Sequence, residues 1–187
     1  MSIKKYMTID IIILTGIACA LEAANVWIVG IFKNELFTLS ITVAVALIIM
    51  MRWKWPAVIT AAAGGLVYCL SSFASFEQYL IYGAGNTAIL LNLLFFKVIN
   101  PREVCSSAWL SALFCITGFV SVLIGRTLFS LVAVFDFANI ILLAASDALN
   151  IVMGLIIILI ARRQKGLFEN QLDYLKRNRE ETEMFYE

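Results

Sequence analysis

The sequence contains no histidine and only two prolines among its 187 residues, and only 14% of it is charged. Histidine is the commonest general base near neutral pH and a frequent metal ligand, so its absence excludes Ser-His-Asp chemistry. The sequence also lacks a glycine-rich phosphate loop ending in Lys and Ser or Thr, and it lacks the HExxH metal motif. We therefore expect no enzymatic activity, no catalytic residue, no cofactor, no metal and no nucleic-acid partner.

The four cysteines do not form a disulfide framework or a metal-binding pattern. They are Cys19, Cys69, Cys105 and Cys115, and each lies in or at the edge of an apolar segment. Their spacing matches no metal motif, so we interpret them as small hydrophobic residues.

Long apolar segments make up most of the chain. Hydrophobic residues account for 62% of it, and the mean hydropathy is +0.93. This composition is typical of integral membrane proteins. The apolar segments are residues 9–32, 36–51, 56–73, 79–96, 104–132 and 136–161. They predict an all-α fold, a six-transmembrane-helix bundle over residues 1–161, followed by a charged cytoplasmic tail over residues 162–187.

The start of the chain has two possible interpretations. Lys4 and Lys5 precede an apolar run, and residues 18–20 imitate a signal-peptide cleavage site. The run is longer than a typical signal-peptide core, however, and it carries Glu22 and Asn25. A retained first helix is therefore favoured.

Basic residues predict the orientation in the cell membrane. With both termini in the cytoplasm, most basic residues near the segment ends lie inside, as the positive-inside rule requires. The inner set is Lys4, Lys5, Arg52, Lys54, Lys97, Arg102, Arg162, Arg163 and Lys165, and the outer set is Lys33 and Arg126.

The last apolar segment carries a polar stripe. Asp136, Asn139, Asp147 and Asn150 fall within an arc of roughly 80° on a helix, with Leu143 between the two pairs. A carboxylate such as Asp147 costs several kcal/mol when it faces lipid, so the stripe must face protein, water or a ligand. The deeper pair, Asp147 and Asn150, is expected either to form a pocket floor or to bond neighbouring helices.

A second polar stripe lies on the fourth segment. Gln78, Tyr82 and Asn86 recur every fourth residue after Glu77, so they share one helix face. Gly83 and Gly85 beside them allow a backbone or a ligand to approach closely. Two interpretations remain open, because Asn86 and Asn92 can line a pocket or merely bond adjacent helices.

Arg126 is the only cation inside a predicted span. It either reaches out to the lipid headgroups or pairs with Asp136, Glu77 or a bound carboxylate. Opposite charges that converge on one pocket favour a polar, zwitterionic ligand.

The first segment has two different faces. Gly16, Ala20 and Ala24 recur every fourth residue, and Glu22 with Asn25 lies nearly opposite. Small residues allow another helix to pack closely, either in this chain or in a partner, while Glu22 is expected to face the bundle interior.

Several short motifs resemble one known family. They are Arg52-Trp53-Lys54-Trp55, the run of residues 64–70 (GGLVYCL), Ile81-Tyr82 and Gly85-Asn86. Six predicted helices in 187 residues, small residues on the first helix and a polar cluster at the outer ends of the later helices accompany these motifs. Together they resemble the substrate-binding S components of energy-coupling factor (ECF) transporters. The resemblance implies high-affinity capture of a vitamin or related micronutrient at the outer face. It also implies docking on an ECF transmembrane subunit driven by two ATPases, all on other chains.

The resemblance also implies site residues. Gly16, Ala20 and Ala24 match the family's small-residue interface with the transmembrane partner, although the family usually has alanine where Gly16 stands. The implied substrate-binding residues are Lys33, Asn34, Glu35, Glu77, Gln78, Tyr82, Asn86, Arg126, Asp136 and Asn139, and Asp147 belongs with them if the deeper pair forms the pocket floor. The charged tail is longer than the family requires.

A different class of protein remains open. In this reading the chain is a small membrane scaffold or assembly protein, whose polar stripes only hold the helices together. Phe168, Leu172 and Leu175 recur at helical spacing in the tail, which predicts an amphipathic helix. That helix would be either a solvated tail or a docking element for a cytoplasmic partner.

Overall fold

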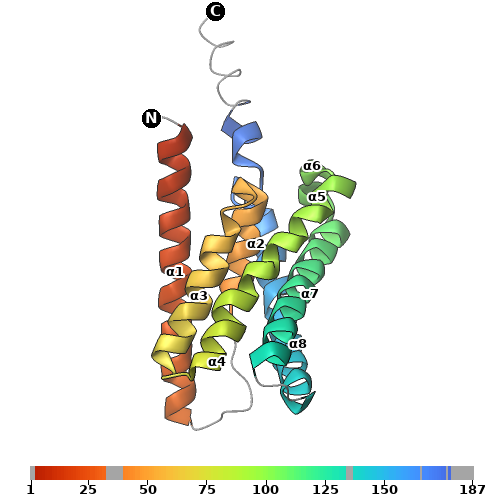
Figure 1. Ribbon diagram of the computed structural model, residues 1–187. Helices are drawn as coiled ribbons and strands as arrows, with labels where there is room; N and C mark the ends of the chain where they lie inside the picture. The colour runs from red at the N-terminus through yellow and green to blue at the C-terminus, as the bar shows by residue number, and fades with distance from the viewer. Residues whose placement is uncertain (1–2, 33–39, 134–136, 165, 176, 178–187) are drawn as a thin grey trace, which may run out of the picture.

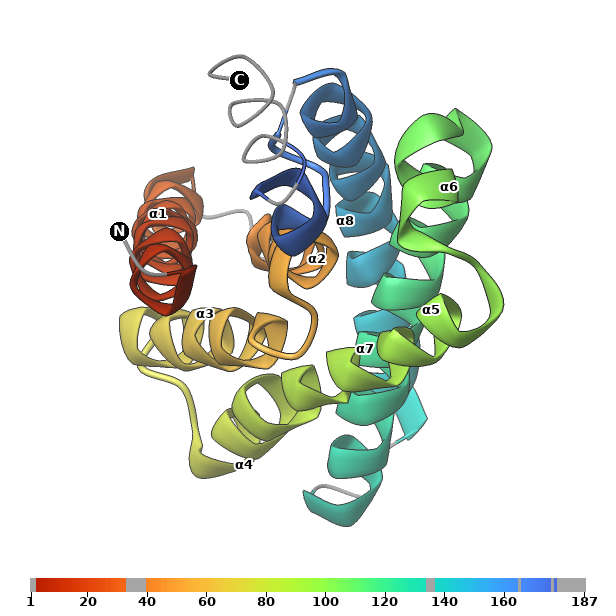
Figure 2. The same cartoon turned by 90° about the horizontal axis from the view of Figure 1, so that it is seen from above.

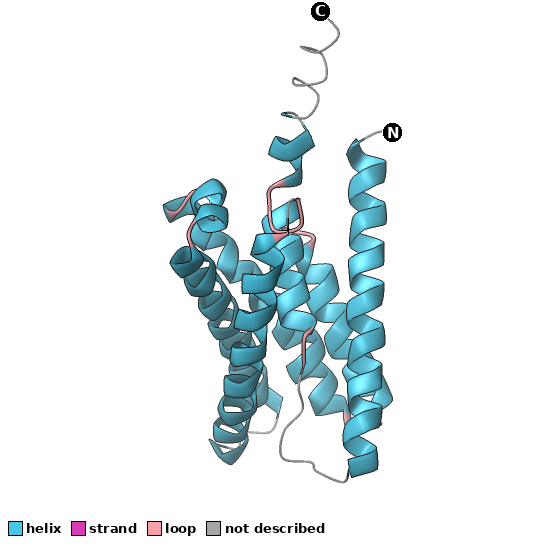
Figure 3. Ribbon diagram, turned by 180° about the vertical axis from the view of Figure 1, so that it is seen from behind, coloured by secondary structure: helices cyan, strands magenta, loops and turns pink. Residues whose placement is uncertain are grey.

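The computed structural model describes residues 3–32, 40–133, 137–164, 166–175 and 177. This part of the chain is helical, without a strand (Figure 3). The helices are α1 (Ile3–Phe32), α2 (Thr42–Trp53), α3 (Ala57–Ser71), α4 (Phe76–Gln78), η1 (Tyr79–Ala84), η2 (Gly85–Leu94), α5 (Phe95–Val98), α6 (Pro101–Ser106), α7 (Ala108–Ala133) and α8 (Phe137–Arg163). The predicted all-α class is confirmed.

Four described helical segments are long and apolar enough to cross a membrane. They are Ile3–Gly30, the continuous run Phe76–Val98, Ala108–Ala133 and Leu143–Arg163. This indicates a multi-pass membrane protein. The helices α2 and α3 are apolar but have only 12 and 15 residues, fewer than the roughly 20 that a helix needs to span the hydrocarbon. Six spans are therefore not established by length.

The short helix α2 lies at the centre of the bundle. It packs against α3, α7 and α8 and also contacts α1, and each of its residues except Val45 is buried. A helix that is apolar on all sides is expected in a core, which explains this position. The long helix α1 stands at the edge of the bundle, mainly against α3 and α2 (Figures 1 and 2).

Two predicted boundaries are corrected. Residues 104–132 do not form one helix, because the extended Ser107 (φ −104°, ψ 124°) separates α6 from α7. The Ser107 hydroxyl accepts a hydrogen bond from the Leu110 N–H at 3.4 Å, as a helix N-cap residue does. The second segment was expected to begin at Leu36, yet α2 begins at Thr42, and Ser40 and Ile41 before it are not helical.

The described part of the tail packs on the bundle. After α8 the chain turns at Gly166, whose φ of +75° is readily adopted only by glycine. Phe168 is 3% exposed, and its ring centroid lies 6.2 Å from that of Phe114. The predicted amphipathic helix is wrong for Phe168, which is not helical, and the side chain of Leu172 is exposed. A freely solvated tail is therefore wrong for residues 166–175.

Candidate functional site

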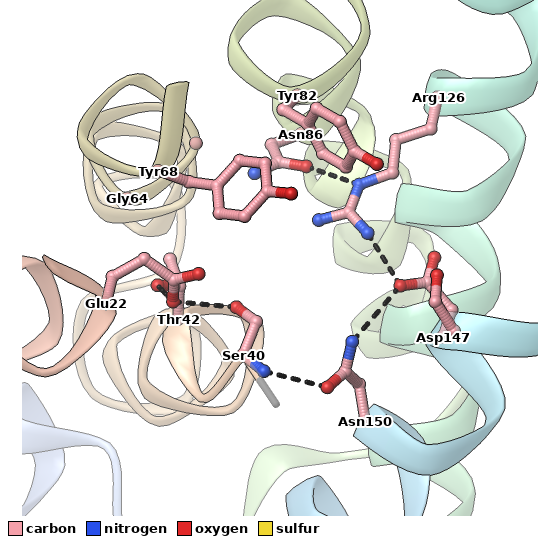
Figure 4. A pocket seen from close by; sticks show the side chains of 12 residues that line it. Glu22, Ser40, Thr42, Gly64, Tyr68, Tyr82, Asn86, Arg126, Asp147 and Asn150 are labelled. Carbon is pink, nitrogen blue, oxygen red and sulfur yellow. Dashed lines mark hydrogen bonds and ion pairs between the residues drawn. The ribbon is translucent and has the colours of Figure 1, made fainter. Parts of the chain in front are cut away.

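A small polar cavity lies between α1, α3, η1, η2, α7, α8 and the start of α2 (Figure 4). Its volume is about 20 Å³, which is enough for one water molecule. Its lining combines charged, amide, hydroxyl and glycine residues. These are Glu22, Ser40, Thr42, Gly64, Gly65, Tyr68, Tyr82, Asn86, Arg126, Ser146, Asp147 and Asn150.

Glycines allow the cavity helices to cross closely. A Cβ atom on Gly85 would lie 2.9 Å from the Cα of Arg126, and one on Gly125 would lie 2.2 Å from the Gly85 carbonyl oxygen. A Cβ atom on Gly65 would lie 2.1 Å from the Tyr82 carbonyl oxygen. Real Cβ contacts are never this short, so only glycine permits these crossings. They bring Tyr82 and Arg126 to the same cavity.

Arg126 is the central cation of the site and is only 5% exposed. Its Nε donates to Asn86 Oδ1 at 2.8 Å, and its Nη1 donates to Asp147 Oδ1 at 2.6 Å. The guanidinium carbon lies 5.1 Å from the centroid of the Tyr82 ring, within the range of a cation–π contact. Asn86 in turn donates to the Ala61 carbonyl oxygen at 2.9 Å, so α3, η2, α7 and α8 are joined by one polar network.

Asp147 has one satisfied and one unsatisfied oxygen. Its Oδ1 binds Arg126 and lies 3.5 Å from the Nδ2 of Asn150, whereas its Oδ2 has no hydrogen-bond partner among the described residues. The residue is only 2% exposed, so Oδ2 is not hydrated from bulk solvent. A buried carboxylate oxygen without a donor is costly and is rare in folded proteins.

Glu22 supplies a second buried carboxylate from α1. Its Oε2 accepts hydrogen bonds from the hydroxyl groups of Ser40 at 2.8 Å and Thr42 at 2.7 Å. The backbone N–H of Ser40 donates to Asn150 Oδ1 at 2.8 Å, which connects Glu22 to Asp147 through Asn150. Figure 4 shows this chain of hydrogen bonds along one side of the cavity. The expectation that Glu22 faces the bundle interior is confirmed.

The structure brings together four of the substrate-binding residues expected from the sequence: Tyr82, Asn86, Arg126 and Asp147. Glu77 and Gln78 lie elsewhere, at the exposed start of α4, where the Gln78 side chain accepts a hydrogen bond from the Ser75 N–H. Arg126 pairs with Asp147, so the alternative in which it pairs with Glu77 is wrong. The alternative in which it reaches out to the lipid headgroups is also wrong, because Arg126 is buried.

The remaining expected site residues cannot be placed. Residues 33–35 and Asp136 lie outside the described residues, and so does the side chain of Asn139. The site that the structure describes is therefore built on the deeper polar pair of α8, Asp147 and Asn150.

Sequence reasoning did not assign Ser40, Thr42 or Tyr68 to the site. Isolated hydroxyl residues are common in apolar helices and carry no pattern that marks a pocket. The one indication in the sequence is Glu22, because a buried carboxylate requires hydrogen-bond donors. Ser40 and Thr42 are the donors that the structure supplies.

The small-residue face of α1 points away from the bundle. Gly16, Ala20 and Ala24 are all exposed, and a Cβ atom on Gly16 would meet nothing within 4 Å. By contrast, the small residues Gly64 and Gly65 of α3 are used inside the chain, because Gly64 packs on Thr42 and Gly65 on Tyr82. Packing within this chain therefore does not explain the small residues of α1.

Comparison with protein-family models, with curated proteins and with solved structures finds no match for this chain.

Proposed function

We propose that this protein is a membrane-embedded binding subunit for uptake of a vitamin or related micronutrient, of the S-component type found in ECF transporters. The observation that carries the proposal is the buried cluster of Glu22, Arg126 and Asp147 around a cavity, with one carboxylate oxygen left without a donor. A cluster that leaves Asp147 Oδ2 without a donor favours a ligand that donates a hydrogen bond to this oxygen. Two carboxylates and one guanidinium suit a polar ligand that carries charge of both signs.

The proposal requires the site to widen. Small-molecule sites usually measure about 300–1,000 Å³, whereas this cavity holds about 20 Å³. A micronutrient must therefore separate the helices that line the cavity. We expect the helices to separate at the contact between Asn150 and Asp147, because this hydrogen bond of 3.5 Å is the longest in the polar network.

The proposed topology has six crossings with both termini in the cytoplasm. Glu22 lies about 18 Å further along α1 than Asp10, at 1.5 Å per residue, so the cavity lies in the outer half of the bundle. The exposed face of Gly16, Ala20 and Ala24 is then available to a transmembrane partner that is driven by two ATPases. Small residues suit such a contact because they let two helix backbones approach closely.

The first test is purification of the tagged chain from its native membrane in mild detergent, followed by mass spectrometry of proteins and small molecules. We expect two ATPases and a helical membrane subunit, together with a bound micronutrient. A chain that carries no ATPase, or only unrelated cytoplasmic proteins, would contradict the proposal. Replacing Gly16 and Ala20 by leucine should abolish recovery of the transmembrane subunit while the chain remains folded.

A matched pair of asparagine variants tests the site itself. Asn86→Ala removes a buried charge-assisted hydrogen bond to Arg126, so we expect ligand affinity to fall by about 2 to 5 kcal/mol, or roughly thirtyfold to several thousandfold. Asn92 is also buried, but it bonds the Phe114 carbonyl oxygen at 3.2 Å and does not line the cavity. Asn92→Ala should therefore reduce stability and leave ligand affinity unchanged.

One observation favours a different function. Most polar groups of the site already bond one another, and the cavity is only water-sized. A small membrane scaffold or assembly protein, with no small-molecule ligand, would need no more than this. In that case Asn86→Ala and Asn92→Ala would both lower stability, and no small molecule would co-purify with the wild-type chain.

A further inference from the structure

A second, larger cavity lies beside α6 and the end of α8. Figure 1 shows α6 at the end of the bundle where α1 begins. The cavity is formed by α6, the end of α8 and the segment that follows α8, and its volume is about 370 Å³. This is within the range of small-molecule sites, about 300–1,000 Å³. The cavity shares no residue with the site around Arg126.

Positive charge dominates the lining of this cavity. Four arginines line it, namely Arg102, Arg162, Arg163 and Arg177, against two carboxylates, Glu169 and Asp173. Arg177 pairs with Glu169, and Arg102 lies 3.4 Å from Asp173. Among the described residues, Arg162 and Arg163 have no carboxylate partner. The described lining therefore has an excess of two positive charges.

Arg162 also ties the two walls of the cavity together. Its Nε donates to the Cys105 carbonyl oxygen at 2.9 Å, and its Nη2 donates to the Ser106 carbonyl oxygen at 2.5 Å. These bonds fix α6 against the end of α8, so the cavity has a defined wall and is not a gap between loose ends. Arg102 and Arg163 remain exposed at its surface.

Apolar residues place this cavity at a membrane boundary. Val98 and Trp109, on either side of α6, are 85% and 74% exposed, and tryptophan is typical of the membrane–water interface. Arg163 follows the exposed Ile156 and Ile160 on one face of α8, at spacings of seven and three residues. An acyl chain that lay along this face would place its headgroup beside Arg163.

We propose that this cavity binds the anionic phosphodiester headgroup of a membrane lipid. The excess of arginine supplies planar donors for phosphate oxygens, and the exposed isoleucines of α8 supply the contact for an acyl chain. Basic pockets between transmembrane helices on the cytoplasmic side are suited to anionic headgroups for the same reasons. The site is independent of the proposed uptake function.

The test uses the purified full-length chain in detergent, titrated with dioleoyl phosphatidylglycerol or with dioleoyl phosphatidylcholine and followed by native mass spectrometry. We expect tighter binding of the anionic lipid. Arg102→Gln combined with Arg163→Gln should weaken that binding about 25-fold, since each basic side chain contributes about fivefold at an anionic lipid surface. The matched control is Lys54→Gln with Lys97→Gln, which removes two exposed charges outside the cavity and should change the affinity less than twofold.

Three results would overturn the proposal. Equal binding of the two lipids by the wild-type chain would show that headgroup charge is not recognised. The lipid would bind elsewhere if the arginine double variant kept its affinity for phosphatidylglycerol while the lysine control lost affinity. Thermal stabilisation by inorganic phosphate or glycerol 3-phosphate that equals the effect of phosphatidylglycerol would identify a soluble anion as the ligand.

Discussion

Two buried arginines, Arg52 and Arg126, each pair with an aspartate inside this bundle, and the two clusters differ in how completely they are bonded. Arg52 forms a two-bond contact with Asp10, at 2.7 and 2.8 Å, and donates to the carbonyl oxygens of Gly166 and Leu167. The Trp53 indole also donates to Asp10, so both carboxylate oxygens are satisfied. Arg126 binds only one oxygen of Asp147, and the other oxygen has no described partner.

The difference separates a structural cluster from a candidate binding site. The Asp10–Arg52 cluster joins α1, α2 and the segment after α8. Neither Asp10 nor Arg52 lines either of the two cavities described above. The Asp147–Arg126 cluster borders a cavity and leaves a buried acceptor unfilled. Full satisfaction rigidifies a polar network, whereas a buried acceptor beside a cavity can accept a hydrogen bond from a water molecule or from a ligand.

The largest expected effect is at the fully bonded cluster. Asp10→Ala removes the carboxylate that satisfies Arg52 and Trp53, and it leaves a buried guanidinium without a counter-charge. We expect a loss of about 3 to 5 kcal/mol in the free energy of unfolding, measured as a lower melting temperature of the purified chain in detergent. Glu77→Ala, at an exposed carboxylate, is the control and should leave the melting temperature nearly unchanged. Equal melting temperatures for Asp10→Ala and Glu77→Ala would contradict a structural role for the Asp10–Arg52 cluster.

A smaller effect is expected where a glycine supports the cavity. Gly65→Ala would place a Cβ atom 2.1 Å from the Tyr82 carbonyl oxygen and 2.8 Å from Asn86 Nδ2. We expect a loss of about 1 to 3 kcal/mol from overpacking and weaker ligand binding, because Asn86 must shift away from Arg126. Gly16→Ala is the matched control. It meets open space and should stabilise α1 by up to about 1 kcal/mol. A Gly65→Ala chain as stable as wild type would contradict the close crossing.

The smallest expected effect on stability is at the incompletely bonded pair. Replacing both partners, Arg126→Met with Asp147→Leu, removes two buried charges and the unsatisfied oxygen together. We expect stability to remain within about 1 kcal/mol of wild type, since apolar replacement of a buried pair is often neutral or favourable. Co-purification of any ligand should be lost. Arg52→Met with Asp10→Leu should instead be clearly destabilising, because the Trp53 indole and two carbonyl groups lose their partners. Replacing Arg126 and Asp147 leaves fewer groups without a partner, namely Asn86 Oδ1 and the Asn150 Nδ2 that is held at 3.5 Å.

Parts of the candidate site could be predicted because charge is expensive in an apolar segment. Glu22 and Asp147 each interrupt such a segment, so each had to face protein, water or a ligand, whereas the longer Arg126 side chain could also have reached out to the lipid headgroups. Which of them would meet could not be predicted, because this depends on how the helices cross. The bond between Arg126 and Asn86 depends on the close contact of the Gly85 and Gly125 backbones, and the pairing of Arg126 with Asp147 depends on the packing of α7 against α8. No pattern along one helix reveals either contact.

The sequence by itself determined the helical class, the apolar character of the long helices and the burial of Glu22. Each of these follows from local composition or from the cost of placing a charge in hydrocarbon. Only the tertiary structure decided that α2 fills the centre of the bundle, that Phe168 folds back onto Phe114, and that Asp147 forms the ion pair with Arg126. These features depend on contacts between residues far apart in the chain, and such contacts are set by the packing of whole helices.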